Sequence, residues 1–146
     1  MRWAFGAACF LSMATLFAAL RPGDPLPANA LATRVVIEKG ARRLTLLQNA
    51  RALKTYRVAL GSNPVGRKQQ EGDRRTPEGS YVIDAHKADS AFHRALHISY
   101  PNAADRASAA SRGVSPGSAI MIHGLPNDMA WLGTLHTLTD WTQGCI

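Results

Sequence analysis

Short runs in which apolar and polar residues alternate restrict what this chain can fold into more than any other feature. The runs RVVIE (34–38), RRLTLLQ (42–48) and LKTYRVALG (53–61) follow one another closely, with short turn segments between them. A period of two with turn residues in between is typical of antiparallel β-hairpins. The first part of the domain is therefore predicted to be an antiparallel sheet.

Three further runs continue the strand pattern: GSYVIDA (79–85), ALHISY (95–100) and SAIMIHG (118–124). The last run is apolar almost throughout, which predicts a strand buried on both faces near the centre of a sheet. The Ala-rich part of the loop 101–117 predicts one or two helical turns before Gly113. Residues 127–141 have apolar side chains at spacings of three and four, which predicts a short helix.

The loop 61–79 holds four glycines, two prolines and seven charged residues, so it is expected to lie on the surface. A chain of 146 residues has room for one modest core. The pattern as a whole predicts a single, mostly β domain with one or two short helices. Its long loops are available to carry a site.

The first thirty residues have a different character. Arg2 is followed by an apolar run from Trp3 to Leu20, and the segment ends in steps of the form Ala-x-Ala up to Ala32. This is the pattern of a cleaved secretory signal peptide, and an uncleaved membrane anchor is the alternative. The predicted boundaries are thus 1–32 for the signal or anchor and 33–146 for the folded domain. The domain is expected in the periplasm or cell envelope, with membrane contact only through its N-terminal segment.

The excess of positive charge lies in the part of the chain that is predicted to be exported. Beyond residue 32 there are 15 Lys and Arg against 9 Asp and Glu, which leaves +6. Such a balance permits an acidic partner outside the cytoplasm and equally describes a solvated basic surface. A nucleic-acid partner is not expected, because zinc-finger spacing, a basic helical stripe and alternating Arg and aromatic residues are all missing from the sequence.

The distribution of the two cysteines makes Cys145 a candidate reactive residue. The other cysteine, Cys9, lies in the apolar N-terminal run, so the exported part would hold a single thiol. Unpaired thiols are unusual in oxidising compartments, and such a cysteine is either reactive or bridged to another chain. A reactive cysteine acts as a thiolate, which a histidine partner can generate.

His123 is the best candidate for that partner. It ends an apolar strand and precedes Gly124, where the chain turns outward; the alternative is a half-buried structural histidine bonded to the backbone. His136 is the next candidate, and the remaining histidines are interpreted as surface or structural residues: His86, His93 and His97. Gly144 lacks a Cβ, so the backbone before Cys145 can turn its N–H groups toward a substrate oxygen.

Two other kinds of site, a metal site and a serine-hydrolase site, are not favoured by the sequence. One cysteine and scattered histidines do not have the spacing of metal ligands, so no metal or cofactor is expected. A serine hydrolase is not expected, because the one G-x-S-x-G match, at 113–117, lies in the loop 101–117 and not at a turn between a strand and a helix.

Four segments together identify a resemblance to a family. They are YRVALGSNPVGRKQQEGDRRTPEGSY, LHISYPN, IMIHGLPN and LHTLTDWTQGCI, and they fall in order within about residues 34–146. The combination resembles the L,D-transpeptidase catalytic domain of the YkuD type, in particular its short periplasmic branch. The specific elements are a GDxxTPEGxY loop, an IHG strand end and a [S/T]xGC motif. His123 and Cys145 are 22 positions apart, as in the branch with an LHxLxDWT insertion.

The resemblance implies a β-sandwich-like fold and a thioester mechanism. Cys145 would attack a peptidoglycan stem peptide after its L-centred third residue, and the acyl group would pass to an amine or to water. His123 would be the base, oriented by a backbone carbonyl near Gly124, and N–H groups around Gly144 and Cys145 would form the oxyanion hole. A wall-linked lipoprotein is a further possible substrate.

The same resemblance assigns weaker roles to three residues. Thr142 would contact the substrate or the His123 loop, or stabilise its own turn, and His136 and Trp141 would line the cleft or pack. Gln143 replaces the histidine found in the commonest form of the motif. The resembled domains continue past the cysteine, so the resemblance also predicts that the 146-residue chain is a C-terminally incomplete domain with weak or no activity.

Three functions remain open at this point. The first is an L,D-transpeptidase in cell wall cross-linking or remodelling. The second is an L,D-peptidase or amidase that releases wall-bound lipoprotein. The third is a non-catalytic fragment that binds the cell wall through its positive charge.

Overall fold

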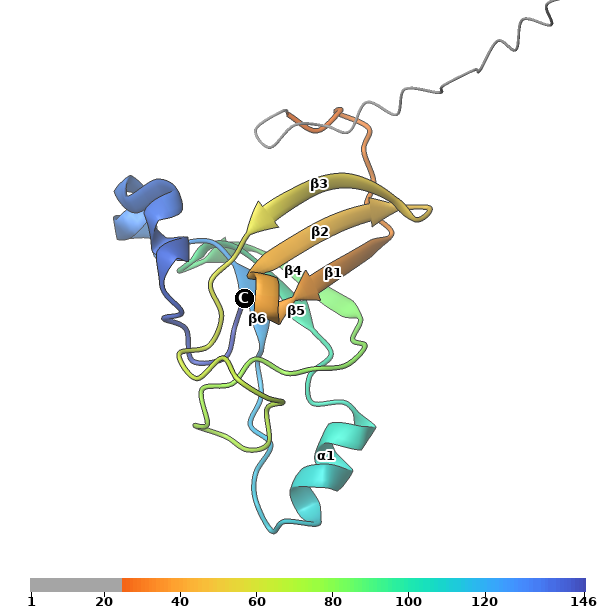
Figure 1. Cartoon of the computed structure of the whole chain (residues 1–146), viewed down its shortest axis with the longest axis vertical. Coiled ribbons are helices and arrows are strands. Elements are labelled where there is room, and N and C mark those ends of the chain that lie inside the picture. The colour runs from red at the N-terminus through yellow and green to blue at the C-terminus, as the bar shows by residue number, and fades with distance from the viewer. Residues whose placement is uncertain (1–24) are drawn as a thin grey trace, which may run out of the picture.

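A computed structural model describes residues 25–146, and it contains two three-stranded antiparallel sheets that lie one over the other (Figure 1). Most of the predicted signal peptide falls in residues 1–24, outside the described residues. Within 25–146, no helix has both the length and the apolar character needed to cross a membrane. The prediction of a mostly β fold is confirmed.

The first sheet is built from consecutive hairpins in the order β1-β2-β3. Its strands are β1 (Arg34–Glu38), β2 (Arg43–Gln48) and β3 (Arg51–Arg57), with the 3-10 turn η1 (Lys39–Ala41) between the first two. Asn49 and Ala50 join β2 to β3 with φ values of 49° and 67°. Two successive positive φ angles are the geometry of a tight hairpin turn, so the predicted hairpins form as expected.

The second sheet has the order β4-β5-β6 and consists of β4 (Ile83–Ser90), β5 (His93–Ile98) and β6 (Met121–His123). The prediction that 118–124 is a doubly buried central strand is wrong. β6 has three residues, stands last in the order and is half-buried. Side chains alternate across a strand, so only Ile122 points into the apolar core, and the other two face the opposite side.

Both predicted helical regions are present. α1 (Ala103–Ala110) begins with a capping box in which the Asn102 side chain and the Asp105 side chain each accept a backbone N–H of the other residue. η2 (Asn127–Leu138) is a 3-10 helix interrupted at Gly133, where φ is 51°. It projects sideways from the sheets in Figure 1.

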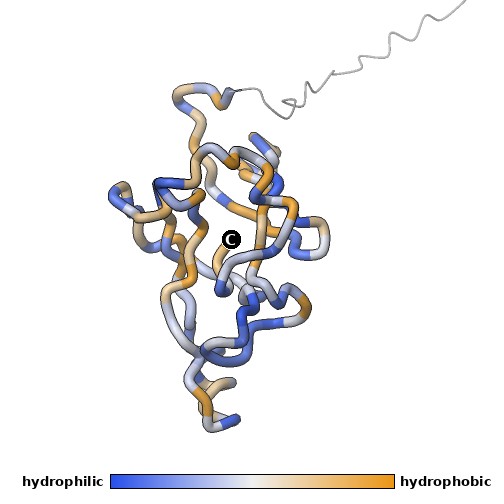
Figure 2. Tube along the Cα trace, turned by 90° about the vertical axis from the view of Figure 1, so that its left-hand side faces the viewer, coloured by the Kyte–Doolittle hydropathy of each residue, from blue (hydrophilic) through white to orange (hydrophobic). Residues whose placement is uncertain are grey.

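The core lies between the two sheets. Hydrophobic tracts flank the C-terminal end of the chain in Figure 2, and hydrophilic tracts lie mainly toward the periphery. Side chains from both sheets and from the C-terminal residue form one buried cluster: Leu44, Leu60, Ile98, Tyr100, Ile120 and Ile146. The C-terminal segment is therefore part of the core and is held in place by it.

Asp140 fastens this segment to the first sheet. Its carboxylate accepts hydrogen bonds from Arg42 Nη2 at 2.7 Å and from Arg42 Nε at 3.0 and 3.1 Å. Oδ1 also accepts the Leu60 backbone N–H at 2.9 Å. Both charged side chains are mostly buried, with 15% of Asp140 exposed, so each depends on the other.

We expect Asp140→Ala to lower the free energy of unfolding by about 2 kcal/mol, because the Arg42 guanidinium and the Leu60 N–H lose their acceptor. Urea denaturation followed by tryptophan fluorescence measures the change. Asp84→Ala is the control, because Asp84 belongs to a more exposed ion pair and should cost less than 1 kcal/mol. Equal losses in the two variants would contradict the anchoring role of Asp140.

Candidate active site

The loop that carries Cys145 is closed by one hydroxyl group. Thr142 Oγ1 accepts the Gly144 N–H at 3.1 Å and donates to the Cys145 carbonyl at 2.7 Å. Thr142 also pairs through its backbone with the 60–62 segment, donating to Leu60 O and accepting from Ser62 N–H. The hydroxyl is thus used inside the turn, which is the turn-stabilising alternative considered for this residue.

Two glycines let the backbone of this loop come very close to its neighbours. A Cβ at Gly144 would lie 2.8 Å from the Arg75 carbonyl oxygen, and φ is 130° at this position. A Cβ at Gly61 would lie 2.1 Å from the Arg74 carbonyl oxygen and 3.0 Å from Gly144 Cα. Any side chain at either position would push the loops apart.

The loop 61–79, expected on the surface, is held by two sets of contacts, one partly exposed and one buried. Lys39 Nζ donates to the carbonyls of Gly66 and Thr76 at 2.7 and 2.8 Å and pairs with Glu78. The ion pair between Lys68 and Asp73, at 2.8 Å, has side chains only 4% and 11% exposed. These contacts hold the loop against the residues that precede Cys145.

Asp73 is held strongly as an anion. Burial alone would raise its pKa, but hydrogen bonds from the Gln69 N–H, the Lys68 side chain and the N–H groups of Arg75 and Gln70 outweigh it, and the pKa falls to about 2. A carboxylate that accepts several N–H donors is a common cause of so low a pKa.

Asp73 should make stability depend on pH in acid. Its pKa in the folded chain, about 2, lies below the ordinary 3.8, so its contribution is complete above pH 3.8 and is lost as the pH falls through 2. We expect Asp73→Asn to be less stable than the unmodified chain at neutral pH and to lose less stability on acidification. Thermal melts from pH 6 to pH 2 measure this, and parallel curves for the two proteins would contradict it.

His123 is oriented by the carbonyl that the resemblance suggested. Its Nδ1 lies 2.7 Å from the Gly124 carbonyl oxygen, so the neutral ring carries its proton on Nδ1 and leaves Nε2 free. The ring of Phe92 packs at 4.5 Å between centroids, and the edge of Trp141 at 5.9 Å. The imidazole is therefore fixed in direction and partly shielded from water.

The pairing of Ile146 places the segment of Cys145 beside the strand that carries His123. The His123 N–H donates to Ile146 O, and the Ile146 N–H donates to Met121 O, both at 2.9 Å. This parallel pairing puts Ile146 beside Ile122 and Cys145 beside Met121. By alternation, the side chains of Cys145 and His123 leave their strands on the side opposite Ile146, and the His123 ring at the strand end also borders the cavity between the sheets.

The thiol is in a resting position. The Cys145 Sγ atom lies 3.9 Å from the Ala119 carbonyl oxygen. Within residues 25–146, no hydrogen bond joins this sulfur to His123. Burial raises the pKa of Cys145, and this outweighs the lowering by the Met121 N–H and the Lys68 cation. Burial thus favours the protonated form of the thiol in this position.

The predicted oxyanion donors differ from each other. The Gly144 N–H is occupied by Thr142, whereas the Cys145 N–H has no acceptor within the described part of the chain. Only the second is free to meet a substrate oxygen without breaking the turn.

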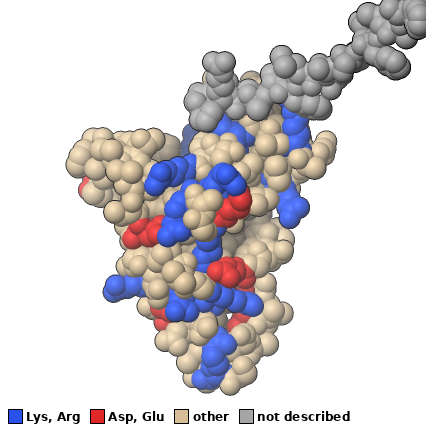
Figure 3. Space-filling model, viewed as in Figure 1, with Lys and Arg blue, Asp and Glu red and all other residues tan. Residues whose placement is uncertain are grey.

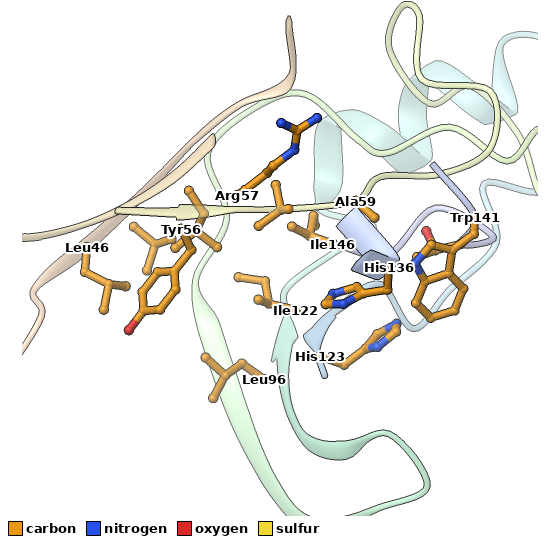
Figure 4. A pocket seen from close by; sticks show the side chains of 14 residues that line it. Leu46, Tyr56, Arg57, Ala59, Leu96, Ile122, His123, His136, Trp141 and Ile146 are labelled. Atoms are coloured by element: carbon orange, nitrogen blue, oxygen red, sulfur yellow. The ribbon is translucent and has the colours of Figure 1, made fainter. Parts of the chain in front are cut away.

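His136 and Trp141 line an apolar cavity of about 350 Å³ between the sheets, together with His123 (Figure 4). The three rings gather at one end, and Leu46, Tyr56, Leu96 and Ile122 lie toward the other. His136 Nδ1 lies 2.5 Å from the Gly133 carbonyl, within its own helix. Trp141 Nε1 is buried without a hydrogen-bond partner. Cys145 does not line this cavity, which lies on the core side of the site.

Of the remaining histidines, His97 pairs with Asp84 at 2.5 Å. His86 and His93 are exposed. No group of three potential metal-binding side chains occurs in residues 25–146. Sequence reasoning missed Phe92, which packs on His123, and Lys68, whose charge acts on the thiol. Phe92 carries no motif, and Lys68 is one of many cations in its loop.

The rate at which iodoacetamide alkylates Cys145 should rise with pH as the thiolate forms. We expect the midpoint of this rise at a higher pH than for an unstructured cysteine peptide, because burial raises the thiol pKa. The rate is followed by mass spectrometry on the peptide that contains Cys145. Unfolding in urea should bring the midpoint down to the peptide value. A midpoint below that of the peptide would show that the resting thiol is already activated.

The fold and the site together define a class of protein: a small β domain with a cysteine on a glycine turn and a strand-end histidine oriented by a backbone carbonyl. Comparison with known proteins agrees. Residues 32–146 match the model of the YkuD family, described as the L,D-transpeptidase catalytic domain. The chain belongs to this family.

Curated relatives match over a shorter stretch. The "Putative L,D-transpeptidase YafK" of Escherichia coli K12 is 38% identical over 74 residues, and the protein of the same name from strain O157:H7 matches equally. The matched stretch is 49% of this chain and 28% of each relative, so the chain spans well under two thirds of their length.

Proposed function

We propose that the protein is a cysteine-dependent L,D-transpeptidase that acts on peptidoglycan stem peptides in cell wall cross-linking or remodelling. The observation that carries the proposal is the oriented His123 ring, with Nε2 free, on the same side of β6 as Cys145. Membership of the YkuD family supports the reaction class. The N-terminal sequence supports export to the periplasm or cell envelope.

In the first half of the reaction, the Cys145 side chain turns from the Ala119 carbonyl and gives its proton to His123 Nε2. The sulfur attacks the carbonyl carbon of the L-centred third residue of the stem peptide. The Cys145 N–H stabilises the resulting oxyanion. When the C–N bond breaks, His123 returns the proton to the departing amine, D-alanine, and a thioester remains.

In the second half, an acceptor amine attacks the thioester carbonyl. His123 removes the proton of the amine, the C–S bond breaks and the sulfur leaves as the thiol or thiolate. If water attacks in place of the amine, the product is the free acid. The same site would then release a wall-linked lipoprotein or trim stem peptides.

The first test is mass analysis after prolonged exposure to a carbapenem, whose strained lactam carbonyl reacts with an activated thiol. We expect one drug mass on the peptide that contains Cys145, formed slowly because the resting thiol is protonated and turned away from His123. Cys145→Ala should form none. His123→Gln should slow the reaction by about 100-fold or more, since it removes the base.

His86→Gln is the matched control, because His86 is an exposed histidine outside the proposed site. It should react like the unmodified chain. Incubation with a tetrapeptide stem, with and without an acceptor amine, then separates transfer from hydrolysis by the product formed. No adduct in the unmodified chain, with wall binding that survives Cys145→Ser and weakens with salt, would replace the enzyme with a wall-binding domain.

A further inference from the structure

The loop 61–79 carries two arginines with no carboxylate partner, directly behind the cysteine turn. Its other cations are paired: Arg67 with Asp105 and Lys68 with Asp73, both at 2.8 Å. Arg74 and Arg75 form no ion pair with any described residue.

Two of the three acids in the same loop pair with lysines, and none of the three forms an ion pair with Arg74 or Arg75. Glu78 pairs with Lys39, and Asp73 pairs with Lys68. Glu71 accepts the Ser115 hydroxyl at 3.0 Å. In Figure 3, Lys and Arg atoms cover more of the visible face than the Asp and Glu atoms that lie among them. The local excess of positive charge is therefore a property of the folded loop.

Arg75 has unused hydrogen-bonding capacity. Its Nε is buried without a partner, and its Nη1 reaches only the Arg67 carbonyl, at the long distance of 3.5 Å. A buried donor without an acceptor is costly and uncommon in folded proteins. A planar anion such as a carboxylate would satisfy a guanidinium in this state.

The backbone of both arginines touches the turn of the nucleophile. The Arg75 carbonyl oxygen lies 2.8 Å from the position of a Cβ at Gly144. The Arg74 carbonyl oxygen lies 2.1 Å from the position of a Cβ at Gly61, which is next to Gly144. Arg74 is exposed and has a left-handed backbone with φ of 57°. The charge of Lys68, from the same loop, already acts on the Cys145 thiol.

From these contacts we infer that Arg74 and Arg75 form a subsite for a substrate carboxylate beside Cys145. This inference rests on the proposed function for the identity of the ligand. There, the C-terminal carboxylate of the donor peptide lies one residue, about 3.8 Å along the chain, beyond the attacked carbonyl. The subsite selects donors that end in a free carboxylate over donors that end in an amide.

The first test does not require enzyme activity. Iodoacetate and iodoacetamide alkylate the same thiol and differ in charge, so the ratio of their rates on Cys145 reports the local potential. We expect this ratio to exceed that of N-acetylcysteine amide by about fivefold at low salt and to approach it at high salt. Arg74→Gln and Arg75→Gln should each lower the ratio by about twofold or more.

Two further variants separate charge from structure. Arg75→Lys keeps the charge and should retain most of the ratio, even if the loop shifts. Arg51→Gln removes an equal charge from the exposed hairpin end of β3 and should leave the ratio unchanged. Equal effects of Arg51→Gln and Arg74→Gln, or no effect of either loop variant, would overturn the subsite.

The second test compares donor peptides that end in a carboxylate or a carboxamide. The unmodified chain should acylate faster with the carboxylate, and Arg74→Gln should reduce that preference mainly through KM. Acylation without any preference would overturn the subsite and leave the proposed function intact. A raised iodoacetate ratio without acylation would overturn the proposed function and leave the anion subsite.

Discussion

The position of Cys145 depends on the close approach of three backbone segments: 60–62, 74–76 and 142–144. Gly61 and Gly144 are the contact points, since a Cβ at either would collide with a carbonyl oxygen of Arg74 or Arg75. The Thr142 hydroxyl and the backbone pairing of Thr142 with its neighbours at 60 and 62 fix the third segment against the first. Because these contacts are between backbones, the position of Cys145 is set by main-chain geometry more than by side-chain packing. A substitution that widens this contact would move the sulfur and the Cys145 N–H together.

The site combines an oriented base with an unactivated thiol. The Gly124 carbonyl and the rings of Phe92 and Trp141 fix His123, whereas the Cys145 sulfur lies against a backbone carbonyl with its pKa raised by burial. Such an arrangement favours the protonated thiol, which oxidises slowly, and in the proposed reaction the thiol would ionise only with substrate bound. Proton transfer to the imidazole would then accompany rotation of the side chain. The free energy needed to ionise the sulfur would then be part of the activation free energy of that step.

The sequence alone predicted the hairpins and the helix before Gly113, because each depends on local pattern. It failed at β6, where an apolar run indicated burial on both faces. The structure buries one face, because the second side of the strand belongs to the site and its edge pairs only with Ile146. It also missed Phe92, Asp140 and Lys68, which act on His123, Arg42 and Cys145, and these partners are distant in the chain. Long-range side-chain contacts of this kind leave no periodic trace in a sequence.

The charges around the loop 61–79 serve two different purposes. The buried pair of Lys68 and Asp73 holds the loop, and because each charge is matched, it adds little net potential at a distance. Arg74 and Arg75 have no matching acid, so their field extends toward solvent. Pairing Arg74 and Arg75 with acids would leave the loop at least as stable. It would remove the positive potential beside the turn that carries Cys145. The proposed carboxylate subsite would give these two arginines an anionic partner that the described part of the fold does not provide.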